Sequence, residues 1–254
     1  MCGFSGFIGK HNLVSDPYSV LKKMGDTLVH RGPDDNGEWY DSKYDVGMAH
    51  RRLSILDLSS AGHQPLVSRS GRYVIAYNGE IYNHMLLRAE LERSHTIKKW
   101  NGHSDTETLL ACFDVWGVQK SLEQVTGMFA FAVWDCKEKV IILGRDRIGE
   151  KPLYYGWQNN TFFFGSELKS FKPHPAFQAE INRDAISLFL RHNYIPSPHS
   201  IYKGILKLQP GNLLILSIAN PEPKIISYWS SSKIVTNGIR NQFGGSEVEA
   251  VDEL

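Results

Sequence analysis

The sequence contains few cysteines and no long apolar run. Its 254 residues include three cysteines, Cys2, Cys112 and Cys136, too few for a disulfide framework in a chain of this length. No stretch of about 18 apolar residues occurs, so a membrane-spanning helix is not expected. The N-terminus lacks the basic start and the small-residue cleavage site of a signal peptide. These absences predict a protein of the reducing cytoplasm with no membrane partner.

The sequence also lacks an excess of charge of either sign and any familiar metal motif. Lysine and arginine total 28, aspartate and glutamate total 27, and the formal net charge is +1. This balance gives no electrostatic reason to expect nucleic acid as a partner. The ten histidines form no HExxH motif and the cysteines no CxxC, so no metal site is predicted. His30 and His50 are expected to hold loops by hydrogen bonds.

Strand-like runs and a few helical patterns follow one another along the chain. Helical spacing or capping residues predict helices that begin near Pro17, Tyr82, Ser104 and Asn182. Consecutive strands separated by a few helices favour an α+β fold over alternating βαβ units. Asn78-Gly79 is interpreted as the turn that ends a strand. The predicted strands cover residues 3–8, 46–50, 73–77, 128–134, 140–143, 153–157 and 161–164.

The composition changes after Trp229. Residues 230–245 are rich in Ser, Asn, Thr and Gly and have no periodicity, which predicts a linker. Ser246 and Glu249 then form a capping-box pattern that predicts a helix running to the last residue, Leu254. We therefore expect one domain over residues 2–229, followed over 230–254 by a linker and the start of a truncated C-terminal domain. A flexible tail is the alternative for this segment.

Cys2 carries the most chemical information. Removal of the initiator Met1 would leave a thiol and a free α-amine on one residue. The amine has a reference pKa of about 7.7–8.0 and the thiol one of about 8.5, so near neutral pH a useful fraction of the amine is free to take the thiol proton. The ordinary alternative is a small residue in an ordered N-terminal strand.

Five other positions fit the chemistry of a thiolate that attacks the side-chain amide of free glutamine. Asn78 and Gly79 can supply amide donors to the oxyanion that develops on the carbonyl. Arg52 can bind the substrate carboxylate bidentately, and Asp105 can accept the ammonium, as can Glu80. Taken singly, each has an ordinary alternative. These alternatives are a turn, a surface ion pair, or an acidic residue favoured in the first turn of a helix.

Seven motifs in chain order resemble the class II glutamine amidotransferases, specifically the N-terminal domain of glutamine-hydrolysing asparagine synthetases. Together they span most of residues 2–215. The motifs are Cys2-Gly3, His30-Arg31-Gly32-Pro33-Asp34, Ala49-His50-Arg51-Arg52-Leu53-Ser54-Ile55, Tyr77-Asn78-Gly79-Glu80-Ile81-Tyr82-Asn83, Ser104-Asp105-Thr106-Glu107, Gly127-Met128-Phe129-Ala130-Phe131 and the segment from Gly144 to Gly156.

The resemblance implies a four-layer αββα sandwich of the N-terminal-nucleophile hydrolase type. It implies that Cys2 is the nucleophile with its α-amine as base, and that Asn78 and the Gly79 backbone form the oxyanion hole. The segments 31–33 and 145–155 would shape the site or the ammonia exit. The residues that the resemblance places around glutamine are Arg52, the backbone of Ile55, Glu80 and Asp105.

The implied activity is hydrolysis of glutamine to glutamate and ammonia, which supplies ammonia to an ATP-dependent asparagine-synthetase-type domain in cis. The glutaminase half is expected to need no metal or organic cofactor, and ATP with Mg is expected only with the synthetase domain. The SGG-x-DS pyrophosphate loop of that domain does not occur here. The segment 144–151 is not a P-loop, because Glu150 follows its second glycine where lysine is required. A homodimer is a further possibility that the resemblance raises.

Two alternatives to this function stay open. The same half-reaction could feed amidation of a different acceptor, such as a sugar or a natural-product acid, which the motifs at 147–151 and 195–199 do not decide. A catalytically silent regulatory or dimerisation module that kept the fold is the other. Retention of Cys2, Asn78, Gly79, Arg52 and Asp105 argues against a silent module, whereas retained Met1 would favour it because a blocked amine cannot act as base.

Overall fold

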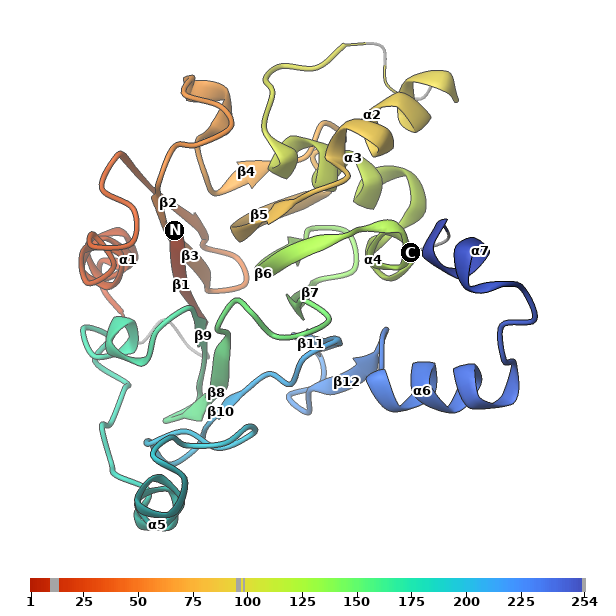
Figure 1. Ribbon diagram of the computed structural model, residues 1–254. Coiled ribbons are helices and arrows are strands. Elements are labelled where there is room, and N and C mark those ends of the chain that lie inside the picture. Colours follow the sequence, from red (N-terminus) through yellow and green to blue (C-terminus); the bar gives the residue numbers. More distant parts are fainter. Residues whose placement is uncertain (10–13, 95–96, 98, 253–254) are drawn as a thin grey trace.

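Two antiparallel β-sheets are stacked face to face at the centre of the molecule, and helices cover their outer faces (Figure 1). The computed structural model describes residues 1–9, 14–94, 97 and 99–252. Within these ranges, no helix is both long enough and apolar enough to cross a bilayer. The predicted helix end at residues 253–254 lies outside the described residues.

The N-terminal strand β1 (Gly3–Ile8) lies inside the first sheet rather than at its edge. It pairs with β3 (Val46–Arg52) on one side and with β9 (Thr161–Gly165) on the other. The strand order is β10-β8-β9-β1-β3-β2. Pairing on both sides therefore holds the residues that follow the N-terminus. The remaining strands of this sheet are β2 (Asp35–Asp41), β8 (Tyr154–Gln158) and β10 (Ile205–Lys207).

The second sheet is built around a long antiparallel pair, β5 (Tyr73–Ile81) and β6 (Gly127–Asp135). Its strand order is β12-β11-β7-β6-β5-β4. All the strands predicted from the sequence are confirmed, with bounds that shift by a few residues. The remaining strands of this sheet are β4 (Leu66–Val67), β7 (Val140–Arg145), β11 (Asn212–Ser217) and β12 (Lys224–Ser227).

Alternation along the strands sorts side chains into layers. In β1, Phe4 and Ile8 point into the core between the sheets, whereas Phe7 packs on the outer side against Leu21 of α1 (Pro17–Asp26). The same core between the sheets contains side chains of both sheets, among them Val46, Met48, Val74, Ala76, Ala130, Ala132 and Trp134. Burial of this apolar surface from both sides is what holds the two sheets together.

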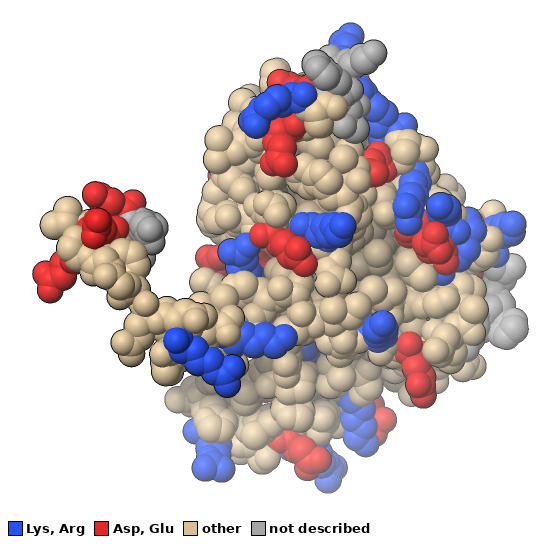
Figure 2. All heavy atoms as spheres, turned by 90° about the vertical axis from the view of Figure 1, so that its right-hand side faces the viewer, with Lys and Arg blue, Asp and Glu red and all other residues tan. Residues whose placement is uncertain are grey.

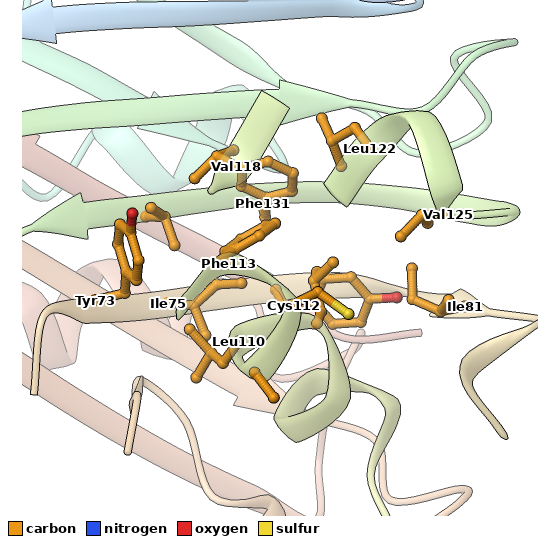
Figure 3. Packing of buried hydrophobic residues seen from close by; sticks show 14 of the residues in the cluster. Tyr73, Ile75, Ile81, Leu110, Cys112, Phe113, Val118, Leu122, Val125 and Phe131 are labelled. Carbon is orange, nitrogen blue, oxygen red and sulfur yellow. The ribbon is translucent and has the colours of Figure 1, made fainter. Parts of the chain in front are cut away.

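Helix α3 (Asp105–Trp116) packs on the outer face of the second sheet. It begins where the capping pattern predicted, because the Ser104 hydroxyl accepts a hydrogen bond from the Glu107 N–H at 3.2 Å. Figure 3 shows Phe113 of α3 beside Phe131, and the ring centroids are 5.5 Å apart. The helices α2 (His84–Arg93) and α4 (Val118–Gln124) contribute to the same apolar cluster. The architecture is therefore a four-layer αββα sandwich.

The interpretation of Asn78-Gly79 as a turn is wrong. Strand β5 continues through both residues to Ile81, with Asn78 opposite Ala130 and Gly79 opposite Phe129 in β6. The turn preference of an Asn-Gly pair is a local effect, and nine consecutive cross-strand pairs override it here. This places the two residues on a rigid strand.

The linker predicted over 230–245 is also partly wrong, because α6 (Ser231–Arg240) forms there with Ser230 as its cap. The predicted capping box of the next helix, α7 (Glu247–Asp252), is confirmed by a bond from the Glu249 N–H to the Ser246 hydroxyl at 3.4 Å. No residue of either helix is buried, and they extend from the body of the molecule as a C-terminal arm, residues 231–252 (Figure 2). The division into two domains stays a prediction.

Helix α5 (Arg183–His192) begins after Asn182, as predicted, because the Asn182 side chain accepts from the Asp184 N–H at 3.1 Å. Its apolar residues Phe189 and Leu190 remain exposed. Two short 3₁₀ turns complete the fold, η1 (Ser60–Gly62) and η2 (Leu168–Phe171).

Replacing Phe113 with alanine should lower the free energy of unfolding by about 3–5 kcal/mol, because the change leaves a cavity between α3 and the second sheet. Phe113 is 1% exposed, so its surroundings are packed on all sides and water cannot readily fill the cavity. Urea unfolding measures the effect. The control is Leu190→Ala, whose side chain is 75% exposed and which should change stability by less than about 0.5 kcal/mol. Equal effects of the two changes would contradict the packing described.

Candidate active site

One cavity of about 90 Å³ brings together all the residues predicted for the site. Cys2 lies two residues before the core residue Phe4, and Asn78 lies two residues after the core residue Ala76. Alternation along each strand therefore directs both side chains to the end of the layer between the sheets. The seven predicted residues that line the cavity are Cys2, Arg52, Ile55, Asn78, Gly79, Glu80 and Asp105.

The thiol of Cys2 is half-buried at the start of β1. Its Sγ atom lies 3.4 Å from the Leu53 backbone nitrogen and 3.6 Å from the Leu53 carbonyl oxygen. Burial raises the pKa of the Cys2 thiol, although the Leu53 N–H, the positive chain terminus and Arg52 act in the opposite direction. The thiol is therefore protonated at neutral pH, and it needs a base to become a nucleophile.

Met1 lines the same cavity. Its Sδ atom lies 3.1 Å from Nζ of Lys151, a buried lysine that also lines the cavity. With Met1 in place, the free α-amine belongs to Met1 and not to Cys2. Removal of Met1 would open space beside Lys151 and put a free amine on the residue that carries the thiol.

Asn78 presents an unpaired donor to the cavity. The residue is 1% exposed, and its Nδ2 atom has no hydrogen-bond partner in the part of the chain that the structure describes. An unsatisfied buried donor costs about 1–3 kcal/mol, so such a group beside a cavity indicates an acceptor on a ligand. At Gly79, a Cβ atom would lie 2.3 Å from the Met128 carbonyl oxygen. Glycine is therefore required for the close approach of β5 and β6 beside the cavity.

Arg52 is held by the loop that follows β3. It is 7% exposed and donates to the Ser59 carbonyl at 2.9 Å and to the Asp57 carbonyl. The Asp57 carboxylate accepts from the Ser59 hydroxyl at 2.6 Å and from the His103 N–H at 2.8 Å, and these bonds lower the pKa of Asp57 to about 2. Arg52 is thus a fixed cation at the cavity wall and not the surface ion pair that was the alternative.

Asp105 is the first residue of α3 and is buried. Its Oδ2 atom accepts from the Tyr77 hydroxyl at 3.0 Å and from the Ile81 N–H at 2.9 Å. Burial raises the pKa of this carboxyl, against the lowering effect of both bonds. Glu80 is half-buried on β5, and Ile55 is exposed on the loop after β3, so Ile55 can contribute to the wall through its backbone.

Two buried side chains outside the predicted site hold the backbone of Tyr77, next to Asn78. The Gln64 side chain accepts from the Tyr77 N–H at 2.8 Å, and Nε2 of His50 lies 2.9 Å from the Tyr77 carbonyl oxygen. Because a carbonyl only accepts, Nε2 carries the proton, and burial lowers the pKa of His50 to about 4. His50 was predicted to hold a loop, but it joins β3 to β5, one strand from each sheet. No pattern in the sequence marked Gln64.

The segment after β7 is organised around the buried carboxylate of Asp146. This carboxylate accepts hydrogen bonds from five backbone N–H groups. These donors are therefore satisfied within the chain, whereas in a P-loop such N–H groups bind phosphate. Arg145 supports the same segment through the Gly149 and Lys151 carbonyls. The donors to Asp146 are the N–H groups of Phe129, Ile148, Gly149, Glu150 and Lys151.

The other two cysteines lie outside the cavity. Cys112 is buried on α3, and burial raises its pKa to about 12. Cys136 follows β6, and burial raises its pKa as well. Burial therefore disfavours the thiolate form of both cysteines, and neither lines the cavity. Among the residues that the structure describes, no three His, Cys, Asp or Glu side chains form a group that could hold a metal ion.

The chain is similar to proteins that use glutamine. A family model described as a glutamine amidotransferase domain matches residues 1–229. The chain is 37% identical over 249 residues to a putative glutamine-hydrolysing asparagine synthetase 2 of Methanocaldococcus jannaschii, an alignment that covers 90% of this chain and 46% of that protein. It is 38% identical over 215 residues to the glutamine-hydrolysing asparagine synthetase 1 of Bacillus subtilis, covering 84% of this chain and 33% of that protein. The chain thus spans between a third and a half of these relatives.

A solved structure of a glutamine phosphoribosylpyrophosphate amidotransferase from B. subtilis has a related fold. It matches with a TM-score of 0.66 at 18% identity and covers 91% of this chain and 50% of that one. Likeness at this identity concerns the fold and not the function. It confirms the predicted four-layer αββα sandwich.

Replacing His50 with glutamine should weaken the loss of stability that acid causes between about pH 6.5 and 4. In this window the unfolded chain protonates His50 while the folded protein keeps it neutral, so the free energy of unfolding falls as the pH falls. The substitution should reduce that slope by up to about 1.4 kcal/mol per pH unit, measured by urea unfolding across the window.

The control for this experiment is His192→Gln on the exposed helix α5, which should keep the slope of the unchanged protein. An unchanged slope in His50→Gln would contradict a neutral, buried His50.

Proposed function

The chain belongs to the glutamine amidotransferase domain family, and from that premise we propose that it hydrolyses the side-chain amide of glutamine with Cys2 as the nucleophile. The products are glutamate and ammonia, and the ammonia serves an amidation. One observation carries the proposal: the Cys2 thiol and the unpartnered Asn78 amide meet at one cavity.

The first half of the reaction forms a thioester. After removal of Met1, the α-amine of Cys2 takes the thiol proton, and Sγ attacks the carboxamide carbon of glutamine. The carbonyl oxygen becomes an oxyanion, which accepts hydrogen bonds from Asn78 Nδ2 and the Gly79 N–H. When the oxyanion collapses, the C–N bond breaks, the leaving nitrogen takes the former thiol proton from the α-ammonium of Cys2, and ammonia departs.

The second half of the reaction restores the thiol. Water attacks the thioester carbon while the α-amine of Cys2 accepts a proton from it. The C–S bond breaks, the thiolate regains the proton, and glutamate departs. Every step uses groups of the chain, glutamine or water, so we propose no metal or organic cofactor for this half-reaction.

The walls of the cavity fit the two charged ends of free glutamine. Arg52 provides a cation that the carbonyls of Asp57 and Ser59 hold in place, which suits the substrate carboxylate. Asp105 and Glu80 provide carboxyl groups for the ammonium. Ile55 lines the same cavity, where its backbone would add a polar contact. These groups come from different strands, loops and helices. Because the fold holds them in fixed positions, they would orient glutamine before the reaction starts.

We propose that the ammonia passes to an ATP-dependent synthetase domain that follows residues 2–229 in the same polypeptide, with residues 230–254 leading into it. The lengths and the names of the asparagine synthetase relatives support this proposal. ATP and Mg would then belong to that domain, and aspartate would be the acceptor. An acceptor of another kind, such as a sugar or a natural-product acid, would leave the glutaminase chemistry described here unchanged.

The intact mass of the purified protein should be short by one methionine. Treatment with the glutamine analogue 6-diazo-5-oxo-norleucine should then add one stoichiometric label, because the analogue alkylates the nucleophile that attacks glutamine. In Cys2→Ala both the label and the release of glutamate should be lost. Cys136→Ala is the matched control, since this half-buried cysteine lies outside the cavity, and it should keep both.

Two results would contradict the proposal. Glutamine hydrolysis that survives in Cys2→Ala would exclude Cys2 as the nucleophile. A retained methionine with no label would favour the silent-module alternative.

Asn78→Ala should lower kcat for glutamine hydrolysis by about 10²–10³ and change KM little, because the amide acts on the oxyanion and not on the bound substrate. Steady-state kinetics measures the two constants. Asn212→Ala is the control, since its amide bonds to the Gln209 and Pro210 carbonyls and does not line the cavity. A loss of affinity with an unchanged kcat would assign Asn78 to substrate binding instead.

A further inference from the structure

A nucleophile at the end of a chain needs more support than one in the middle, because chain ends are poorly ordered unless they are tied down. Strand β1 begins at Gly3, so its ladder pairs Gly3 with Arg51 but leaves Cys2 outside. Outside the ladder, the Cys2 thiol contacts the Leu53 backbone, and the Cys2 carbonyl depends on a side chain for its position.

Arg31 supplies one such contact. Its Nε atom donates to the Cys2 carbonyl oxygen at 2.8 Å. The side chain lies directly against Gly3, where a Cβ atom would be 2.9 Å from the Arg31 Cδ atom. With 10% of its side chain exposed, Arg31 is almost fully enclosed. It can hold the Cys2 carbonyl only if its own guanidinium is fixed.

Glu167 fixes that guanidinium. Its Oε1 atom accepts from Nη1 of Arg31 at 2.9 Å. The preceding residue, Ser166, is tied to β1 at two points: its hydroxyl accepts from the Phe4 N–H at 3.1 Å, and its own N–H donates to the Phe4 carbonyl at 2.9 Å. The carboxylate is therefore anchored to the strand whose first residue follows Cys2.

Two further side chains face the Glu167 carboxylate. Nε2 of His30 lies 3.1 Å from Oε1, and Nζ of Lys169 lies 3.3 Å from Oε2. Burial acts to raise the pKa of Glu167, but the hydrogen bonds from Arg31, His30 and Lys169 outweigh it and lower the pKa. His30 and Lys169 are about half exposed, with 51% and 46% of their side chains open to solvent, so Arg31 is the enclosed partner.

We propose that Glu167 is a positioning residue for the N-terminal nucleophile: its carboxylate holds the Arg31 guanidinium, which holds the carbonyl of Cys2. The proposal rests on the proposed function of Cys2. Neither Glu167 nor Arg31 is among the described residues that line the cavity, so we expect neither to contact glutamine. Their effect must pass through the placement of Cys2, where a displacement of about 1 Å is enough to lower a rate a hundredfold.

Glu167→Ala, made in the full chain with Met1 removed, should lower kcat for glutamine hydrolysis about ten- to hundredfold, with KM changed less than about threefold. Glu167→Gln should lower kcat less than Glu167→Ala does, because the amide oxygen can still accept a hydrogen bond from Arg31. The rate at which iodoacetamide alkylates Cys2 at fixed pH should also change in Glu167→Ala. A merely structural role would lower the melting temperature without this split between kcat and KM.

A double-mutant cycle tests the route through Arg31. If Glu167 acts by holding Arg31, then Glu167→Ala in an Arg31→Ala background should cost little beyond the single change, so the two effects are not additive. Lys169→Met removes a cation that contacts Glu167 without contacting Cys2, and it should leave kcat within about twofold. Glu180→Gln, which breaks a surface ion pair with Lys203, is the matched carboxylate control, and it should also leave kcat within about twofold.

The outcomes separate this inference from the proposed function. If the unchanged protein hydrolyses glutamine and Cys2→Ala does not, but Glu167→Ala keeps the original kcat and alkylation rate, the positioning role is overturned and the function stands. Additive effects of the Arg31 and Glu167 changes would also overturn it. If the unchanged protein does not hydrolyse glutamine, the function fails, and the alkylation rate still decides whether Glu167 controls Cys2.

Discussion

The structure depends on holding the free end of the chain in one place. Strand β1 is paired on both sides, with β3 and with β9, although an N-terminal strand could have been placed at an edge. Two neighbours give β1 two hydrogen-bonded ladders. The β1 side chains Phe4 and Ile8 also pack against side chains of the second sheet. Cys2, the proposed nucleophile, immediately precedes this anchored segment. A group near the chain end, which is usually mobile, therefore becomes part of a rigid wall.

The second half of the site is fixed by bonds between the sheets. His50 of β3 contacts the Tyr77 carbonyl of β5, and Gln64 holds the Tyr77 N–H, so the residue before Asn78 is held from both sides. This allows an amide donor to remain unpaired beside the cavity without the strand moving to satisfy it. In the proposed reaction, such a donor would stabilise the oxyanion without rearrangement, and preorganised donors of this kind usually make the largest single contribution to catalysis.

Much of the site and the fold follows from local signals in the sequence. The seven cavity residues fall in ordered motifs, and the alternation of β1 and the cap at Ser104 have local causes that a sequence displays. Asn78-Gly79 was misjudged because cross-strand pairing with β6 decides its conformation, and pairing is not a local property. Gln64 and Glu167 were missed for a related reason. Each acts on a residue far away in sequence, Tyr77 or Arg31, and their own neighbours show no pattern.

The loop around Asp146 has a consequence for how relatives of this chain can diverge. Four of the N–H groups that donate to its carboxylate come from consecutive residues, 148–151, so the length of the loop is fixed by these hydrogen bonds. An inserted or deleted residue there would leave donors unpaired and carry Lys151 away from the cavity. The loop after β3 is different, because Leu56 and Leu58 are exposed at its surface. Changes of specificity are therefore expected at the exposed side chains of Leu56 and Leu58, whereas the length of 146–151 and the carbonyls of Asp57 and Ser59 that hold Arg52 are constrained.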